Sequence, residues 1–138
     1  IIGRFSAETG SHVETMVNRT ISYEMNPDPE AAWYKKGSGF ASNQGPGDNG
    51  EYDNEHMDII RELLLDYTYT EIDQIYDPTG TVAQGEAALN EGRSILNYTG
   101  HGSNGSFGNG CPMNNTDVNG LDNGGKWPFI WSVACVNG

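Results

Sequence analysis

Two side chains in the last third of the sequence have the chemistry of a nucleophile and its base. Cys135 carries a thiol and His101 an imidazole, and each follows a short segment rich in apolar residues. A thiolate is a strong nucleophile, and a neighbouring imidazole can take the thiol proton and later protonate a leaving group. Glycines on both sides of His101 would let a substrate backbone approach closely and leave N–H groups for an oxyanion. These residue types predict thiol catalysis if the fold brings them together.

Other interpretations of the same residues stay open at this point. A cysteine at the end of a buried strand is most often a small core residue, and a histidine in a glycine-rich loop is usually solvated. Cys111 offers a third interpretation, because it could form a disulfide with Cys135 in a secreted chain. Such a disulfide would remove the nucleophile.

Periodicity in the sequence predicts the elements that must position these residues. Apolar residues at helical spacing predict helices over 12–25, 54–67, 82–90 and about 116–121. The first of them is expected to begin with a capping box, Ser11-x-x-Glu14. Alternating or continuous apolar residues predict strands over 39–42, 70–76, 94–98 and 128–134, and residues 1–5 resemble a strand already under way.

The order of these elements predicts the fold class. Strands that alternate with helices indicate an α/β fold with a mainly parallel sheet and helices on both of its faces. The last strand, residues 128–134, is apolar on both faces and is therefore predicted to be central in the sheet. Because functional residues of such sheets collect at the carboxyl ends of strands, His101 and Cys135 are expected at the same edge.

The composition excludes several classes of protein. The 138 residues include 19 acidic and only 7 basic side chains, for a formal charge of −12. So few basic residues cannot form the patch that nucleic acid binding needs, whereas an acidic surface favours cationic ligands. The apolar runs are too short for a membrane-spanning helix. The length is that of one domain, residues 1–138, which we expect to be part of a larger protein because the sequence starts and stops within strand-like segments.

Patterns for metal binding are weak. Two cysteines and three histidines show no paired spacing for zinc. One acidic loop carries oxygen ligands of the kind that Ca²⁺ takes, without the spacing of an EF-hand, at Asp48, Asn49, Glu51, Asp53 and Glu55. This loop predicts either a structural calcium site or a solvated acidic surface.

Several segments, in the same order along nearly the whole chain, resemble the gingipains, the secreted cysteine endopeptidases of peptidase family C25. The most specific similarity surrounds the two candidate catalytic residues, at 97–103 (Asn-Tyr-Thr-Gly-His-Gly-Ser) and at 133–138 (Val-Ala-Cys-Val-Asn-Gly). Further similar segments lie at 2–6, 19–24, 48–53, 76–78 and 128–130. The resemblance implies a caspase-like α/β fold and places residues 1–138 in the catalytic subdomain of a larger peptidase.

The resemblance also implies roles for single residues. Cys135 would be the nucleophile and His101 the acid and base, and the N–H groups of Gly102 and Cys135 would form the oxyanion hole. Asp53 would lie at the base of the S1 pocket and pair with a substrate arginine, although from its sequence position it could equally cap the following helix. Gln44 stands in a shortened loop where the family has a glutamate. It is expected to orient the imidazole through its carbonyl but not to supply a charge.

The function implied by the resemblance is that of a secreted or cell-surface endopeptidase that cleaves after a basic residue, preferably arginine. Its partners would be protein or peptide substrates with basic residues and the flanking subdomains. It would require no cofactor, although a structural calcium ion is compatible with the family. Two alternatives are a transpeptidase of a secretion system, in which an amine replaces water, and a catalytically silent binding domain of the same fold.

Overall fold

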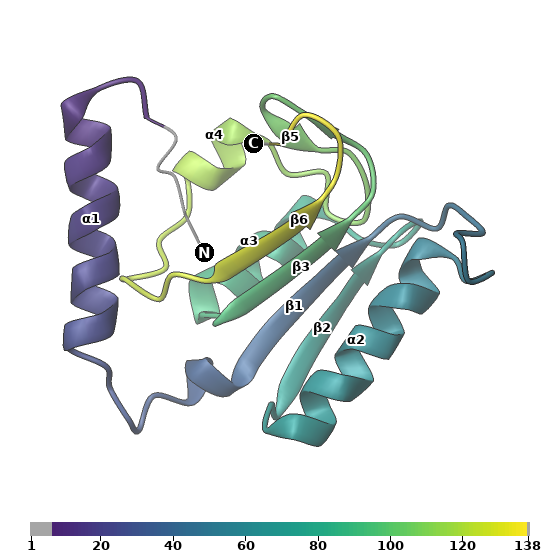
Figure 1. The fold of residues 1–138 in the computed structure, drawn as a ribbon, viewed down its shortest axis with the longest axis horizontal. Coiled ribbons are helices and arrows are strands. Elements are labelled where there is room, and N and C mark those ends of the chain that lie inside the picture. Colours follow the sequence, from purple (N-terminus) through teal and green to yellow (C-terminus); the bar gives the residue numbers. More distant parts are fainter. Residues whose placement is uncertain (1–6, 138) are drawn as a thin grey trace. The chain divides into compact units, whose positions relative to one another are not determined.

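The computed structural model describes residues 7–137 of the chain (Figure 1). These residues form two compact units, residues 7–31 and residues 32–137. The strand expected at residues 1–5 lies outside the described residues. No helix in the described part of the chain is both long and apolar enough to cross a membrane.

The first unit contains one long helix, α1, which spans Gly10–Met25. Its N-cap is Thr9, because Thr9 Oγ1 accepts a hydrogen bond from the N–H of His12 at 3.3 Å. The expected capping box at Ser11 is therefore wrong, since Ser11 already lies inside the first turn. Several cap-forming residues precede the helix, and the backbone conformation decides which of them takes the cap position.

The second unit is built around a four-stranded parallel sheet with the strand order β2-β1-β3-β6 (Figure 1). The strands of the sheet are β1 (Lys36–Ala41), β2 (Glu71–Tyr76), β3 (Ile95–Thr99) and β6 (Phe129–Val133). Its helices are the 3-10 helix η1 (Ala32–Lys35) and the α-helices α2 (Asp53–Tyr67), α3 (Val82–Glu91) and α4 (Asn115–Asn119). A short hairpin, which was not predicted, is formed by β4 (Gly102–Ser103) and β5 (Ser106–Phe107).

Helices α2 and α3 cover opposite faces of this sheet, as predicted. On the α2 face, a Cβ atom at Gly39 would lie only 2.7 Å from Cγ of Met57, so glycine lets the helix approach the strand closely. On the other face, Phe40 and Ile75 form the hydrophobic core together with Leu89 of α3. Side chains of a strand alternate between the two faces, which is why neighbouring positions of β1 contact different helices.

Among the residues that the structure describes, strand β6 lies at the edge of the sheet and not at its centre, where it was predicted. Within residues 32–137 it pairs with β3, and all five of its side chains are exposed. Phe129 and Trp131 are 63% and 60% exposed, with ring centroids 6.3 Å apart. The central strands are instead β1 and β3, although β1 is rich in glycine. Apolar composition indicates that both faces of a strand can be buried. It does not indicate which strands pair with it, and therefore whether it lies at the centre or at the edge of the sheet.

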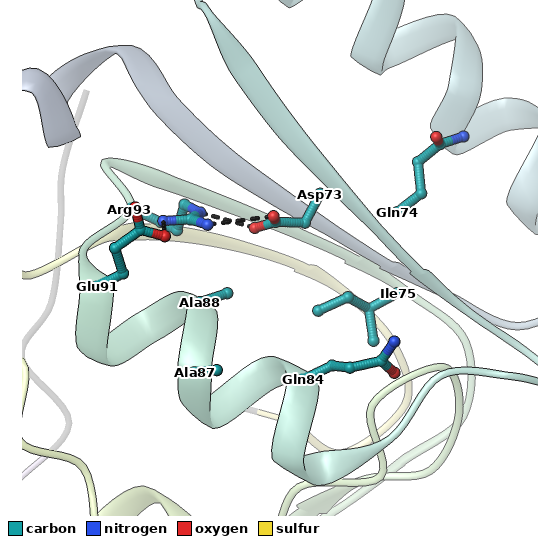
Figure 2. Close-up of a pocket in the computed structure, with 8 residues that line it drawn as sticks. All are labelled: Asp73, Gln74, Ile75, Gln84, Ala87, Ala88, Glu91 and Arg93. Atoms are coloured by element: carbon teal, nitrogen blue, oxygen red, sulfur yellow. Dashed lines mark hydrogen bonds and ion pairs between the residues drawn. The ribbon is translucent and has the colours of Figure 1, made fainter.

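A network of charged side chains lies at the amino-terminal edge of the sheet. The Arg93 side chain is only 3% exposed, and its Nε donates a hydrogen bond to Asp73 at 2.7 Å (Figure 2). Its two terminal nitrogens lie 3.0 Å from Glu91 and 3.3 Å from Glu71. Lys36 adds a second cation, with Nζ 2.9 Å from the Glu71 carboxylate. We call these five residues the Arg93 network.

A pocket of about 350 Å³ lies between β2 and α3, beside the Arg93 network (Figure 2). Its lining residues are Asp73, Gln74, Ile75, Gln84, Ala87, Ala88, Glu91 and Arg93. The charged groups of this lining pair with one another rather than pointing into the space. The pocket therefore belongs to the scaffold, and the candidate catalytic residues lie at the opposite ends of the strands.

Candidate active site

The parallel pairing of β3 and β6 brings the segments of His101 and Cys135 to the same edge of the sheet. Thr99 is in register with Val133, and the two candidate residues each follow two positions later. The segments also approach each other beyond the strands, because a Cβ atom at Gly102 would lie 2.7 Å from the carbonyl oxygen of Cys135. The histidine and the cysteine therefore lie on neighbouring loops at the carboxyl ends of adjacent strands.

Cys135 lies in a tight turn that follows β6 directly, and its side chain is exposed. The next residue, Val136, has a φ of 62°, a left-handed conformation that β-branched residues rarely adopt. Asn137 ties this turn back to the strand, since its Nδ2 donates to Ser132 Oγ at 3.2 Å. Strained backbone of this kind is concentrated at functional sites, where the surrounding structure holds a side chain in a fixed position.

The two cysteines do not form a disulfide, so that interpretation is wrong. Cys111 is fully buried in the core, where a Cβ atom at Gly85 would lie 2.3 Å from its sulfur. Burial raises the pKa of the Cys111 thiol to about 11. Cys111 is therefore a core residue and a poor nucleophile near neutral pH, which leaves Cys135 as the accessible thiol.

The imidazole of His101 is held by Gln44. Nε2 of the ring lies 2.8 Å from Gln44 Oε1. An amide oxygen can only accept a hydrogen bond, so Nε2 carries the ring proton and Nδ1 is the basic nitrogen. The structure thus brings Gln44 and His101 together, as the sequence analysis expected. With the proton on Nε2, the ring leaves Nδ1 free to take a proton from a thiol.

The backbone of His101 is fixed by residues that the sequence analysis did not single out. Its N–H donates to Asn109 Oδ1 at 2.9 Å, and its carbonyl accepts hydrogen bonds from the N–H of Gly108 at 2.7 Å and from the Tyr98 hydroxyl. Asn109 in turn donates through Nδ2 to Asp77 at 2.8 Å. Of these residues, Tyr98 and Asp77 lie within segments that resemble the gingipains, and this was the one signal that could have found them.

Asp53 is the first residue of α2, and its carboxylate faces the end of β1. Ser42 Oγ donates a hydrogen bond to Asp53 Oδ2, and the Asp53 N–H donates to the carbonyl of Gln44 at 2.9 Å. Tyr52 is the N-cap of the helix, and its N–H is bound by Glu55 at 2.9 Å. The interpretation of Asp53 as the N-cap is therefore wrong, and its carboxylate is positioned at the carboxyl edge of the sheet by Ser42.

The charged side chains of the acidic loop take different partners in this structure. Glu51 pairs with His56 at 2.9 Å, and this hydrogen bond holds the pKa of the Glu51 carboxyl below its usual value. The Glu55 carboxylate accepts a hydrogen bond from the Tyr52 N–H at the start of α2. The Asp53 carboxylate accepts one from the Ser42 hydroxyl at the end of β1. In the part of the chain that the structure describes, no three His, Cys, Asp or Glu side chains gather where they could hold a metal ion.

Known proteins with similar sequences and structures agree with these observations. The chain is 43% identical to Gingipain R2 of Porphyromonas gingivalis over 139 residues, which cover 99% of this chain and 19% of that protein. It is 43% identical to Gingipain R1 of Porphyromonas gingivalis, with 99% of this chain and 14% of that protein covered. The crystal structure of the Arg-specific cysteine proteinase gingipain R (RgpB) matches with a TM-score of 0.92 and 43% identity, covering 99% of this chain and 32% of that one.

These comparisons confirm the caspase-like α/β fold and the resemblance to the gingipains. The chain spans 19% or less of the length of the two curated relatives named above. The family description that matches, peptidase family C25, extends over residues 1–138. The chain therefore belongs to peptidase family C25.

Proposed function

We propose that this chain carries the catalytic dyad of a cysteine endopeptidase, with Cys135 as the nucleophile and His101 as the acid and base. One observation carries the proposal, the meeting of two loops at the carboxyl edge of the sheet. One loop holds an imidazole that Gln44 orients, and the other holds an exposed thiol in a strained turn. The relative of known structure is itself named an Arg-specific cysteine proteinase, which supports the same reaction class.

In acylation, the thiol of Cys135 transfers its proton to Nδ1 of His101, the ring nitrogen that does not face Gln44. The thiolate attacks the scissile carbonyl carbon, so an S–C bond forms and the carbonyl oxygen becomes an oxyanion. The N–H groups of Gly102 and Cys135 are proposed to stabilise that oxyanion. The imidazolium then gives its proton to the leaving nitrogen as the C–N bond breaks, which leaves a thioester.

Deacylation uses the same groups with water as the nucleophile. The imidazole of His101 takes a proton from water as the water oxygen attacks the thioester carbon. The S–C bond breaks, the carboxylic acid product leaves, and the sulfur of Cys135 regains its proton from the imidazolium. The Gln44 carbonyl can support the imidazolium through a hydrogen bond, but it adds no negative charge to offset the positive one.

We assign the specificity for arginine to Asp53. A guanidinium is planar and forms charge-assisted, often bidentate pairs with a carboxylate, whereas the lysine ammonium behaves as a point charge. The net charge of −12 favours basic substrates in general. Asp53 would add the local preference for arginine as the residue before the scissile bond.

The proposed setting is the outside of the cell or its surface, with protein or peptide substrates that contain basic residues and with the flanking parts of the protein completing the substrate cleft. The transpeptidase alternative has no specific observation in its favour. The silent-domain alternative draws support from Gln44 in the place of the family's glutamate, but Gln44 contacts the imidazole.

The experiment that tests this proposal is the mass-spectrometric mapping of cleavage sites in a peptide library, with the full-length protein and with glycinamide present. We expect new carboxyl termini at arginine, with the free acid as the main product. Cleavage without preference for basic residues would overturn the assigned specificity. Products joined to glycinamide would instead identify a transpeptidase.

A further inference from the structure

We propose that Ser42 is a positioning residue that couples the arginine-binding carboxylate of Asp53 to the imidazole of His101. The inference rests on the proposed function, because Asp53 and His101 have these roles only there. It concerns a residue whose single buried hydroxyl contacts both the Asp53 carboxylate and the backbone of Gln44, the residue that contacts the imidazole.

Ser42 follows β1 directly and is only 1% exposed. Its Oγ donates a hydrogen bond to Asp53 Oδ2 and accepts one from the N–H of Gln44 at 3.1 Å. Its backbone N–H donates to the carbonyl of Thr99 at 3.0 Å, at the end of the strand that leads to His101. The buried hydroxyl therefore acts both as donor to a carboxylate and as acceptor from the loop.

The hydrogen bonds continue from Ser42 to the imidazole. The N–H of Asp53 donates to the Gln44 carbonyl at 2.9 Å, which closes a ring with the two bonds of the Ser42 hydroxyl. The Gln44 side chain then reaches His101 Nε2 at 2.8 Å. A contiguous series of contacts thus joins the carboxylate that would bind substrate to the ring that would move the proton.

Removal of the Ser42 hydroxyl would change both ends of this series. The hydroxyl-to-carboxylate bond is charge-assisted, and its loss leaves Asp53 Oδ2 without the donor that fixes its position. The N–H of Gln44 also loses its acceptor, the buried Ser42 hydroxyl, so the loop that carries the orienting amide is no longer held there. We therefore expect substrate binding and the chemical step to weaken together.

Ser38, which lies within β1, provides a matched control for Ser42. It is also 1% exposed, and its Oγ donates to a carboxylate, Asp73 Oδ2, at 2.5 Å. That bond lies in the Arg93 network, whose Asp73 and Arg93 are drawn in Figure 2, at the opposite end of the strands. Ser38→Ala removes the same kind of bond as Ser42→Ala without touching the candidate active site.

The first test compares both variants in the full-length protein on matched substrates with arginine or its uncharged isostere citrulline before the scissile bond. For Ser42→Ala we expect kcat/KM on the arginyl substrate to fall about 10- to 100-fold, through both a higher KM and a lower kcat. The preference for arginine over citrulline should fall as well. For Ser38→Ala we expect kinetic parameters within about twofold of the wild type, with a comparable loss of thermal stability. Equal kinetic losses in the two variants, or no loss in Ser42→Ala, would overturn the inference.

The second test does not depend on activity. Amide hydrogen exchange in Ser42→Ala should become faster at the N–H groups of Gln44 and Asp53 and remain unchanged around Asp73, with the reverse pattern in Ser38→Ala. Unchanged exchange at Gln44 would contradict the coupling even in an active enzyme. Failure of the proposed function would appear differently, as a wild-type protein that does not cleave after arginine.

Discussion

The two edges of the parallel sheet use polar side chains in opposite ways. At the amino edge, the guanidinium of Arg93 is buried and its nitrogens pair with three carboxylates, those of Asp73, Glu71 and Glu91. At the carboxyl edge, the His101 and Cys135 side chains are exposed, and the fixed groups are the backbone and the side chains that orient them. One edge consists of charges that satisfy one another, and the other presents groups that can still react.

This difference separates a stabilising cluster from a candidate catalytic site. Charged groups that pair with each other hold α3 and the strands together, but they offer little to a ligand. Reactive groups must keep an unused donor, acceptor or nucleophilic atom. The fold therefore fixes the backbone that carries them and the side chains that orient them. The comparison implies that substitutions at the amino edge should reduce stability, and that substitutions at the carboxyl edge should reduce activity.

The largest expected effect is that of removing the nucleophile. Cys135→Ala should lower kcat/KM on arginyl peptides by more than about 10⁴-fold with little change in unfolding temperature, because an exposed side chain is lost. Cys111→Ala is the matched control, and it should keep the wild-type kinetics while losing about 1 kcal/mol of stability from the core. Steady-state kinetics and thermal unfolding measure the two effects, and undiminished turnover by Cys135→Ala would end the protease interpretation.

The next largest effect should come from Asp53→Asn. This change removes the charge but keeps an amide oxygen that can accept the Ser42 hydrogen bond. We expect kcat/KM on arginyl substrates to fall by the equivalent of about 2–4 kcal/mol, while citrulline substrates hardly change. The ratio of the two substrates is the measurement, and an unaltered ratio would move Asp53 from the candidate active site to the scaffold.

A comparable change at the amino edge should act on stability instead. Arg93→Met removes the cation that three carboxylates share and leaves only Lys36 beside Glu71 and Glu91. The free energy of unfolding should fall by about 2–3 kcal/mol, a loss that is limited because those carboxylates are partly exposed. Denaturant unfolding measures this loss. The value of kcat, measured well below the unfolding temperature, should stay within about twofold of the wild type, and a large fall in kcat would show that the two edges are not independent.

A smaller effect is expected from the residue that orients the imidazole. Gln44→Ala removes a single hydrogen bond, so kcat should fall about tenfold while the ratio of arginine to citrulline substrates changes little. Gln44→Glu keeps the acceptor and adds a charge that favours the imidazolium, so the acid limb of the pH–activity profile, where the base becomes protonated, should move to higher pH. A profile that does not move would mean that the residue at position 44 does not contact the ring during catalysis.

The smallest expected effect concerns pH and the Arg93 network. Hydrogen bonds from Lys36, and then from Arg93, hold the pKa of the Glu91 carboxyl below its ordinary value of 4.5. A depressed pKa contributes stability above the ordinary value, and the contribution is lost as the pH falls through the depressed one. Because the Glu91 side chain is 53% exposed, solvent screening limits its contribution to the free energy of unfolding to about 0.5 kcal/mol. Unfolding curves from pH 7 to about pH 3 should show a shallower acid loss in Glu91→Gln than in wild type, and identical slopes would contradict this assignment.

The sequence was sufficient to predict most of the fold, because the regular elements have strong local patterns. The alternation within Glu71–Tyr76 and the helical spacing within Asp53–Tyr67 predicted their elements to within one residue at each end. The position of β6 was not predictable in this way, since an apolar strand does not specify its neighbours. The hairpin of β4 and β5 was missed because its strands are two residues long, too short for a period to be visible.

For the candidate site, residue chemistry identified His101 and Cys135, and the carboxyl-edge rule correctly placed both at one edge of the sheet. The supporting residues could not be predicted, because their hydrogen bonds join positions far apart in the sequence. Asn109 binds Asp77 across 32 residues, and Ser42 binds Asp53 across 11. Local sequence patterns do not indicate such pairs, so these hydrogen bonds could be identified only from the three-dimensional structure.

The most direct test of the central claim is to locate the adduct that an arginyl chloromethyl ketone forms with the full-length protein. This reagent combines the side chain that Asp53 would bind with a chloromethyl carbon that a thiolate attacks, forming an S–C bond and displacing chloride. Peptide mass spectrometry at neutral pH should find the adduct on Cys135, with little on Cys111, whose pKa is raised to about 11 by burial. An excess of an arginine-containing peptide should slow the labelling. An adduct on Cys111 alone, or labelling of Cys135 at the same rate by an apolar chloromethyl ketone, would contradict an arginine-directed dyad built on Cys135.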